Sequence, residues 1–369
     1  MLELLCRLAS RGYKKSSRHS DESLELYDAG LGNWREVESK STEFYTKSVW
    51  LFITTIYRIN QDVKKRFERF MSSVTLASEQ DDVTAVFILQ SPRDKNSNAK
   101  SLIENWIHEY ATLENIVFGL VDNIGRKVSS INGVLKTLTS QSVLCIGWLD
   151  DDILFQPELI SQMNGKFFSN ENYLAIGATK QAIARKYRWA RLLTHAKAAM
   201  STPVTKYPSG CAILIDRKRF IDGIPNRYDS DDDYICFELI SDIRGNGQLP
   251  WHINSETVCI HLVGGPFGQS KKRIRRSLLW MSIFLADYKT KGSGFYFTQI
   301  AFFGMWPITK FDRSNGTTRG IQKMILKYIY FVWFCRFFFE LVIRGLISRP
   351  LETVDWAAYN NPTFGVEDE

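Results

Sequence analysis

The strongest constraint on the fold lies in residues 83–150, where long apolar stretches alternate with amphipathic ones. Residues 83–90, 116–121 and 142–149 are uncharged and mostly apolar, and each has the length of a buried strand. Between them, apolar residues recur at the i, i+3, i+4, i+7 spacing of a helix, first as Ile103, Trp106, Ile107 and Tyr110 and then as Ile131, Val134, Leu135 and Leu138. This order predicts βαβ units, a parallel sheet and an α/β fold.

The segments on either side predict a three-part organisation. Further strands and one helix are predicted by apolar runs at 174–178, 212–215 and 258–262 and by the helical spacing of Cys236, Leu239, Ile240 and Ile243. We therefore expect residues 83–290 to form one mixed, mainly parallel sheet flanked by helices. Residues 1–82 are expected to be a partly helical N-terminal extension without chemistry. Residues 291–369 are expected to be an apolar, amphipathic C-terminal region with a tail.

Composition narrows the class of protein. The chain has 369 residues, of which 44% are hydrophobic, so it can bury a sizeable core and is neither fibrous nor wholly disordered. Lys and Arg number 47 against 40 Asp and Glu, and this excess favours an anionic partner such as nucleotide phosphates, nucleic acid or an acidic membrane face. The six cysteines are scattered without a CxxC pair, which excludes a disulfide scaffold or zinc module and favours a cytoplasmic protein.

Membrane contact is the second question that the sequence raises. The N-terminus lacks the order of a secretory signal, and the uncharged run 295–308 is shorter than the roughly 20 residues that a span needs. Within 328–344, Arg336, Glu340 and Arg344 recur every four residues and would form a polar stripe on an otherwise aromatic and aliphatic helix. Such a helix either lies in a bilayer interface, at the cytoplasmic face of a membrane, or packs on the protein's own core.

Polar side chains stand where the predicted strands end. Ligands of parallel α/β sheets bind at the carboxyl ends of the strands, where this sequence has Ser91, Asp122 and Asp150. Asp150, Asp151 and Asp152 are adjacent and repel one another, and strand alternation sends Asp150 and Asp152 to the same side. Two such carboxylates would suit Mg²⁺ or Mn²⁺. The alternative is a solvated acidic turn.

A second acidic cluster, residues 229–233, precedes the predicted helix that carries Cys236. Acidic residues at this place are ordinary helix caps. A carboxylate here would also suit a general base. The helix dipole would lower its pKa and the neighbouring aspartates would raise it, and the sequence leaves the balance open.

These motifs and their order resemble the family 2 glycosyltransferases of the GT-A fold, over residues 83–290. The resemblance rests on a strand that ends in Ser91-Pro92, on Asp122-Asn123, on Gly125-Arg126-Lys127 with Asn132, on the strand with Asp150-Asp151-Asp152, on Ser209-Gly210-Cys211-Ala212 and on Asp232-Asp233-Tyr234. The family places a nucleotide-sugar and a divalent metal at the strand ends and an acceptor beside them.

The resemblance implies a role for each matching residue. On the donor side, the nucleotide-sugar would be held by Ser91, Asp122, Lys127, Asp150 and Asp151, and the metal, Mn²⁺ or Mg²⁺, by Asp150, Asp152 and His261. The acceptor side would be lined by Gly210 and Cys211, with Asp233 as general base and Asp232 where the family usually has Glu. The diphosphate would meet Arg273 and Arg276 in the basic run 271–276.

The function that follows is inverting, metal-dependent sugar transfer from a nucleotide-diphosphate donor. The acceptor would be a saccharide or a lipid-linked molecule, in cell-surface polysaccharide or glycolipid synthesis. The Arg-Trp pair of processive relatives is missing, since Trp280 follows the basic run at a distance. Two other classes compete: a nucleotidyltransferase, although residues 91–98 lack its glycine-rich loop, and a non-catalytic membrane or nucleic-acid binder. No nucleic-acid-binding signature is present, so no such partner is expected.

Overall fold

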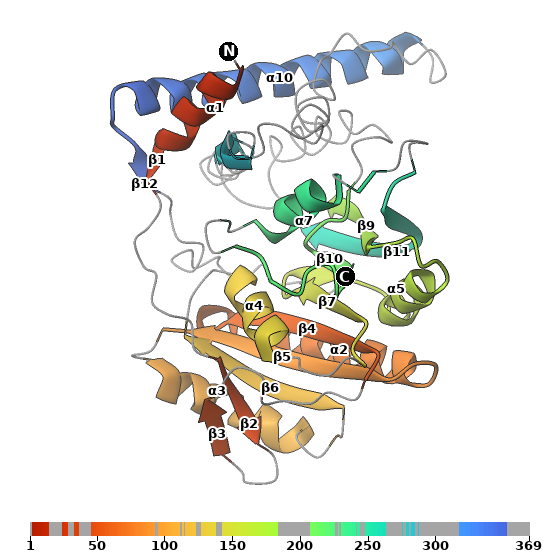
Figure 1. Cartoon of the computed structure of the whole chain (residues 1–369). Coiled ribbons are helices and arrows are strands. Elements are labelled where there is room, and N and C mark those ends of the chain that lie inside the picture. Colours follow the sequence, from red (N-terminus) through yellow and green to blue (C-terminus); the bar gives the residue numbers. More distant parts are fainter. Residues whose placement is uncertain are drawn as a thin grey trace.

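The computed structural model describes a mixed sheet with helices on both faces and a pair of terminal helices beside it (Figure 1). The described residues are 2–14, 24–28, 33–36, 46–92, 95–110, 113, 115–122, 127–137, 142–183, 207–225, 228, 230–240, 242–243, 248–262, 275, 278–279, 282–284, 287 and 317–352.

Ten strands among these residues form the main sheet, in the order β3-β2-β6-β5-β4-β7-β10-β9-β11-β8. The parallel centre consists of β4 (Ser48–Thr55), β5 (Val83–Ser91), β6 (Ile116–Asp122) and β7 (Cys145–Asp150). One edge carries β2 (Leu24–Asp28) and β3 (Asn33–Glu36), and the other half contains β8 (Ile153–Leu154), β9 (Ala175–Ile183), β10 (Ala212–Asp216) and β11 (Trp251–Leu262). The expected mixed, mainly parallel sheet with flanking helices is confirmed.

The strand order places a topological switch point between β4 and β7. The chain runs outward from β4 through β5 to β6 and then returns to β7 on the opposite side of β4. In open α/β sheets, a crevice for ligands forms beyond the carboxyl ends of the two strands that flank such a reversal. The ends of β4 and β7, at Thr55 and Asp150, are therefore where the topology alone places a site.

The predicted boundary at residue 82 is corrected by this sheet. Residues 1–82 are not an extension outside the fold, because β4 is its central strand and β2 and β3 extend its edge. The β4 sequence SVWLFITT is buried on both faces and so lacks the alternation that marks a half-exposed strand. The charged segment after it forms helix α2 (Gln61–Ser78), whose first turn is capped by Asn60, which accepts a hydrogen bond from the Val63 N–H at 2.9 Å.

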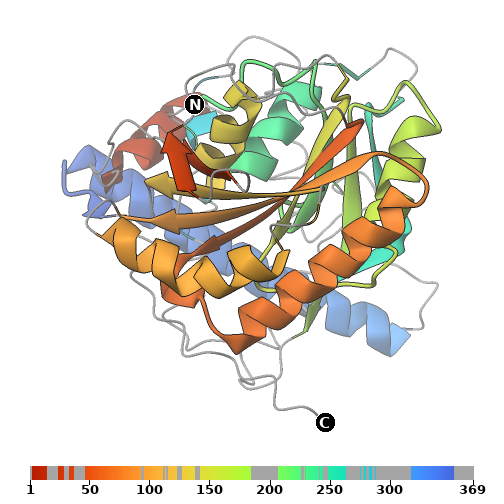
Figure 2. The same ribbon diagram turned by 90° about the horizontal axis from the view of Figure 1, so that it is seen from below.

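The side chains on the two faces of β4 belong to two hydrophobic cores. Val49, Leu51 and Ile53 pack with α4 (Lys127–Thr137) and α7 (Asp231–Ile240). Trp50 and Phe52 point the other way, toward α2, α3 (Asn96–Tyr110) and α5 (Leu159–Phe168). The helices therefore cover both faces of the sheet (Figure 2).

The core is tightly packed around Gly147 in β7. A Cβ atom there would lie 2.6 Å from the Trp50 ring, and Trp50 is fully buried. We expect Gly147→Ala to lower the free energy of unfolding in urea by about 1–3 kcal/mol, because an overpacked core must shift. Gly165 in helix α5 has open space around the same position and is the matched control, for which alanine should stabilise by roughly 0.5–1 kcal/mol. An equal change in the free energy of unfolding for Gly147→Ala and Gly165→Ala would contradict this difference in packing.

The two ends of the described chain pair with each other and pack on one of the two cores. Helix α1 (Leu2–Arg11) packs on α10 (Thr317–Leu346), and the strands that follow them, β1 (Tyr13–Lys14) and β12 (Leu351–Glu352), pair in parallel. The predicted amphipathic helix of residues 328–344 lies within α10, whereas residues 295–308 lie outside the described residues. No helix in the described part of the chain is both long and apolar enough to cross a membrane.

Candidate active site

Lys127 joins the two acidic clusters at the switch point. It is the first residue of α4, and its Nζ lies 2.9 Å from Asp150 Oδ1 at the end of β7 and 2.9 Å from Asp231 Oδ2 at the start of α7. The same ammonium donates to the Gly210 carbonyl at 2.8 Å. Trp148 holds Asp231 in place, since its Nε1–H donates to Asp231 Oδ2 at 2.8 Å. Two acidic clusters that are far apart in sequence therefore meet at the ammonium group of Lys127.

Strand pairing explains why Gly210 and Cys211 lie beside Asp150. β10 runs antiparallel to β7 with Ala212 opposite Leu149, and the Asp150 N–H donates to the Cys211 carbonyl at 3.0 Å. A Cβ atom at Gly210 would lie 2.9 Å from Asp231 Oδ2 and 3.1 Å from Lys127 Nζ. Glycine is required there because the backbone approaches the charged groups directly.

Asp151 is engaged within the protein instead of facing the crevice. Its carboxylate accepts from Thr54 Oγ1 at 2.6 Å and from Arg58 at 2.5 Å, and only 4% of the residue is exposed. The negative charge of Asp151 is the largest cause of the raised pKa of Arg58. These contacts give Asp151 an anchoring role within the protein, whereas Asp150 and Asp152 are both partly exposed.

Asp232 and Asp233, the predicted catalytic pair, have different surroundings. Asp232 Oδ2 accepts from the Gly210 N–H at 3.1 Å, which ties α7 to the loop before β10. Asp233 accepts from Tyr207 O–H at 3.3 Å and from Ser230 O–H at 2.7 Å. Among the described residues, Asp232 thus has a backbone partner, and Asp233 accepts from two hydroxyl groups, of which the Ser230 hydroxyl also lies 3.0 Å from Asp232 Oδ1.

The pKa values of the acids in the two clusters also differ. Burial and then repulsion from Asp232 raise the pKa of Asp233 to about 7. Burial also opposes ionisation of Asp232, but Lys127 and the Gly210 N–H hold its pKa below the ordinary value. Burial and the charge of Asp152 raise the pKa of Asp150 to about 6, against the attraction of Lys127. The site therefore offers one carboxylate that accepts a proton near neutral pH.

These shifts predict that stability falls as the pH rises from about 4 to about 7. Over this window the folded protein keeps protons on Asp150 and Asp233, whereas ordinary aspartates of the unfolded chain, with a pKa of 3.8, have lost them. The folded state binds more protons, so the free energy of unfolding decreases with pH. Asp233→Asn cannot ionise and should show a shallower decrease in urea denaturation across this range. A decrease as steep as in the unchanged protein would contradict the raised pKa of Asp233.

The other predicted donor residues lie farther along the sheet. Ser91 ends β5 opposite Asp122 at the end of β6, so both stand on the β5–β6 side of β4. Ser91 is fully buried and its hydroxyl donates to the Pro92 carbonyl at 3.2 Å. Asn132 of the motif is a structural clamp, because its side-chain amide bonds both the N–H and the carbonyl of Ile224.

Three predicted residues are not settled by the described part of the chain. Arg273 and Arg276 lie outside the described residues, and so does the side chain of His261, although its backbone pairs with Ile153, next to Asp152. Arg275 of the same basic run is described, and it is ion-paired with Glu340 of α10. Within the described residues, no three His, Cys, Asp or Glu side chains are gathered as a metal site.

Sequence reasoning missed several residues of the site. Asp231 belongs to a cluster that was recognised, but its contact with Lys127 was not foreseen. Thr54 lies in the β4 strand that the sequence did not reveal, and Arg58 lies in the turn after it. Tyr207 carries no sequence signal, and Ser230 lies within the recognised cluster 229–233, but its contact with Asp233 was not foreseen. The apolar run that ends at Thr55 was the one signal for the first two, once that run is taken as a strand.

Comparisons with known proteins bear on the fold. No protein-family model and no curated protein matches the sequence. Among solved structures, the chain is similar to the mannosyltransferase PcManGT from Pyrobaculum calidifontis in complex with GDP-Man and Mn²⁺, with a TM-score of 0.51 and 13% identity over 85% of this chain and 89% of that one. S. aureus TarS has a TM-score of 0.46 and 11% identity over 82% of this chain and 54% of that one. The GT-A type of fold is confirmed, and membership of family 2 stays a prediction.

Proposed function

We propose that this protein transfers a sugar from a nucleotide-diphosphate donor to a saccharide or lipid-linked acceptor, with inversion at the anomeric carbon. The observation that carries the proposal is the meeting of two acidic clusters at Lys127, 2.9 Å from Asp150 and 2.9 Å from Asp231. Such a reaction needs two different acidic functions at one crevice. One supports the departing diphosphate, and the other removes the proton of the attacking hydroxyl.

Asp233 is the general base in this proposal. Its pKa of about 7 lets it accept a proton near neutral pH, and Tyr207 and Ser230 hold its oxygens in place. Asp232 is less suited, because its pKa is lowered and one oxygen is used by the Gly210 N–H. A base on the face opposite the leaving group gives inversion. The proton moves from the acceptor hydroxyl to a carboxylate oxygen of Asp233 as the new glycosidic bond forms.

Asp150 and Asp152 are the donor-side acids. Their oxygens suit a hard divalent cation, and the raised pKa of Asp150 reflects burial and repulsion that a cation would relieve. When bound, Mn²⁺ or Mg²⁺ would neutralise charge on the diphosphate. With two carboxylates from the protein, diphosphate oxygens and water would complete its shell. The similar mannosyltransferase structure holds GDP-Man and Mn²⁺, which supports this ligand class.

The biological setting that we propose is cell-surface polysaccharide or glycolipid synthesis. Within the site, we propose that Ser91 and Asp122 lie on the nucleotide side and that Gly210 and Cys211 lie on the acceptor side. Support for the latter pair is their position beside Lys127 and Asp150. The roles of Arg273, Arg276 and His261 stay predictions.

Product analysis tests the proposed reaction class. The full-length protein is incubated with Mn²⁺ and a panel of labelled nucleotide-sugars, with sugar and lipid-phosphate acceptors. We expect release of nucleoside diphosphate together with a labelled glycoside of inverted configuration. Release of pyrophosphate from a nucleoside triphosphate and a sugar phosphate would overturn the proposal in favour of nucleotidyl transfer.

A further inference from the structure

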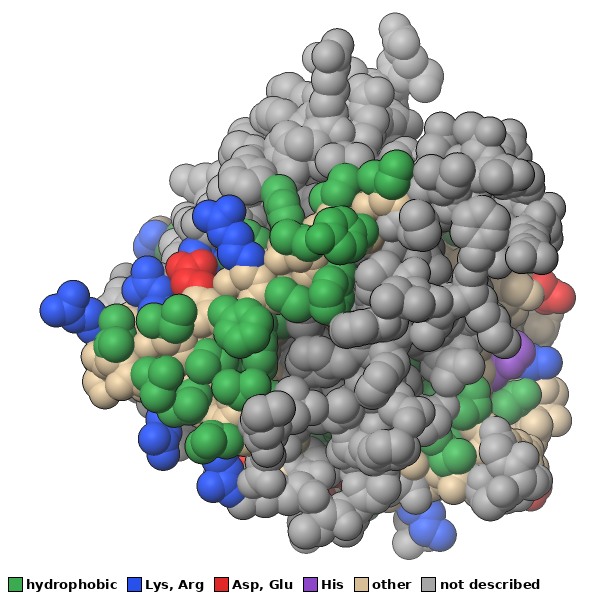
Figure 3. Space-filling model, turned by 90° about the horizontal axis from the view of Figure 1, so that it is seen from above, with side chains coloured by type: hydrophobic (Ala, Val, Ile, Leu, Met, Phe, Trp, Pro, Cys, Tyr) green, Lys and Arg blue, Asp and Glu red, His purple; other side chains and the backbone are tan. Residues whose placement is uncertain are grey.

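Helix α10 carries an exposed apolar stripe along its length. Its members are exposed by between 43% and 61%: Ile325, Tyr328, Val332, Phe339, Ile343 and Leu346. At about 100° per residue they fall within an arc of roughly 60°, and they extend over roughly 30 Å of helix. Figure 3 shows hydrophobic side chains gathered along this face of the molecule.

The opposite side of the same helix is buried against the protein's own core. Phe337, Phe338, Leu341 and Val342 are all at most 5% exposed and belong to the core that contains α7. A surface helix of a globular protein normally presents polar residues to solvent, opposite its buried stripe. One face of residues 328–344 therefore packs on the core, as one of the two interpretations expected, and a second apolar face is exposed.

The charges around the stripe are basic. Arg336 lies beside it on the helix, Arg344 and Arg349 line the groove with Phe339 and Ile343, and on the neighbouring α1 Arg7 and Arg11 are exposed. Residues 317–350 contain six Lys or Arg and one carboxylate, Glu340. Glu340 is neutralised by Arg275 and by Arg344, whose Nε lies 3.4 Å away. Lys and Arg side chains stand at the margin of the apolar band in Figure 3.

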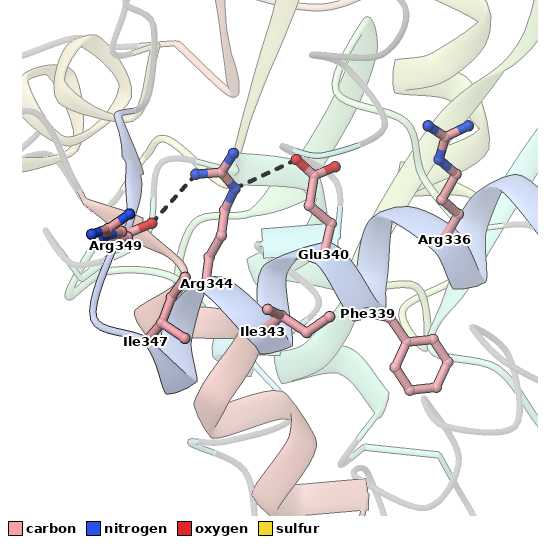
Figure 4. A pocket seen from close by; sticks show the side chains of 7 residues that line it. All are labelled: Arg336, Phe339, Glu340, Ile343, Arg344, Ile347 and Arg349. Carbon is pink, nitrogen blue, oxygen red and sulfur yellow. Dashed lines mark hydrogen bonds and ion pairs between the residues drawn. The ribbon is translucent and has the colours of Figure 1, made fainter.

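A groove adjoins the stripe at its C-terminal end (Figure 4). It has a volume of about 620 Å³ and is lined by Phe339 and Ile343 together with Arg336, Arg344 and Arg349. Arg344 is oriented by its contact with Glu340 and by a bond to the Arg349 carbonyl at 3.5 Å, while Arg336 extends away from the helix (Figure 4). Apolar walls with guanidinium groups at the rim match the boundary between acyl chains and anionic headgroups.

We propose that the α1–α10 face binds the surface of a bilayer that contains anionic phospholipid. The apolar stripe would enter the acyl boundary, Tyr328 would lie at headgroup level, and the arginines would contact phosphates. Charge complementarity favours this occupant over a second copy of the chain, because two copies would bring the same arginines together. The inference does not rest on the proposed sugar transfer, which uses other residues.

Vesicle flotation of the full-length protein tests this inference. Vesicles of phosphatidylcholine alone are compared with vesicles in which about one third is phosphatidylglycerol. We expect binding to the anionic vesicles that weakens as salt is raised. Arg336→Gln with Arg349→Gln should weaken it about 30-fold, the effect of two basic residues near an anionic surface. Phe339→Ser with Ile343→Ser should abolish it.

The control replaces exposed apolar residues elsewhere, Leu102→Ser with Ile221→Ser, which are 51% and 53% exposed. This variant should bind vesicles as the unchanged protein does. Binding that is absent for both vesicle types, or equal in the stripe and control variants, would overturn the inference. A concentration-dependent dimer in light scattering, lost only in the Phe339/Ile343 variant and without vesicle binding, would assign the face to a second copy instead.

Discussion

Asp233→Asn is expected to bind nucleotide-sugar with nearly unchanged affinity and to lose transfer by about 10²–10⁴-fold in kcat. Asparagine keeps the shape of the side chain, and its oxygen can accept from one of the two hydroxyls of Tyr207 and Ser230 while its NH₂ group donates to the other. It cannot accept the proton of the attacking hydroxyl. Calorimetric titration gives the affinity, and single-turnover rates give the chemical step. A loss confined to kcat separates a base from a residue that only binds.

The matched control is Asp232→Asn, one residue away in the same helix turn. Its oxygen can still accept from the Gly210 N–H, so we expect a much smaller loss in kcat. The pH profile adds a second test, because the limb assigned to Asp233, with a pKa of about 7, should vanish in the Asp233 variant only. Full activity of Asp233→Asn, or an equal loss in both variants, would reject Asp233 as the base.

Lys127→Met is expected to destabilise the protein by about 3 kcal/mol at neutral pH, the lower part of the range for a broken buried ion pair. Methionine keeps the length of the stem but leaves Asp150 and Asp231 without their shared cation, and the side chain of Asp231 is only 8% exposed. Urea denaturation at neutral pH measures the loss. The loss should shrink on acidification, as both carboxylates take up protons.

Two controls define the origin of this loss. Adding Asp231→Asn to Lys127→Met should recover part of the stability, because one unpaired charge is removed and Trp148 can still donate to the amide oxygen. Lys64→Met breaks an ion pair of the same length, 2.9 Å to Glu109, on an exposed surface and should change stability little. A Lys127 loss no larger than that of Lys64 would mean that the lysine does not join the clusters.

Much of the architecture was predictable because the strands are buried on both faces and separated by clear helical spacing. β5, β6 and β7 and the helices between them follow the expected ranges closely. β4 was missed because polar residues precede its apolar run and the charged segment 61–70 follows it, although Val63, Phe67 and Phe70 of that segment recur at helical spacing. Its place at the centre of the sheet depends on pairing with β5 and β7, which no local pattern of residues 48–55 reveals.

The site was predictable as a set of clusters, and less so residue by residue. Alternation separated Asp151 from Asp150 and Asp152, but the partners of Asp151, Thr54 and Arg58, come from the missed strand and the turn after it. The sequence also left open whether the helix dipole or the neighbouring acids govern the pKa of Asp233. Burial is the largest cause of the shift, and burial depends on the tertiary fold.

The most direct test of the account is the thermal stability of the protein with nucleoside diphosphates and their sugars, measured with and without Mn²⁺. A ligand that binds only the folded state must raise its melting temperature. We predict a rise for at least one nucleotide when Mn²⁺ is present, little rise without the metal, and loss of the effect in Asp152→Ala but not in Asp222→Ala, an exposed acid away from the site. No rise with any nucleotide in the presence of Mn²⁺ or Mg²⁺, or an equal rise in Asp152→Ala, would contradict it.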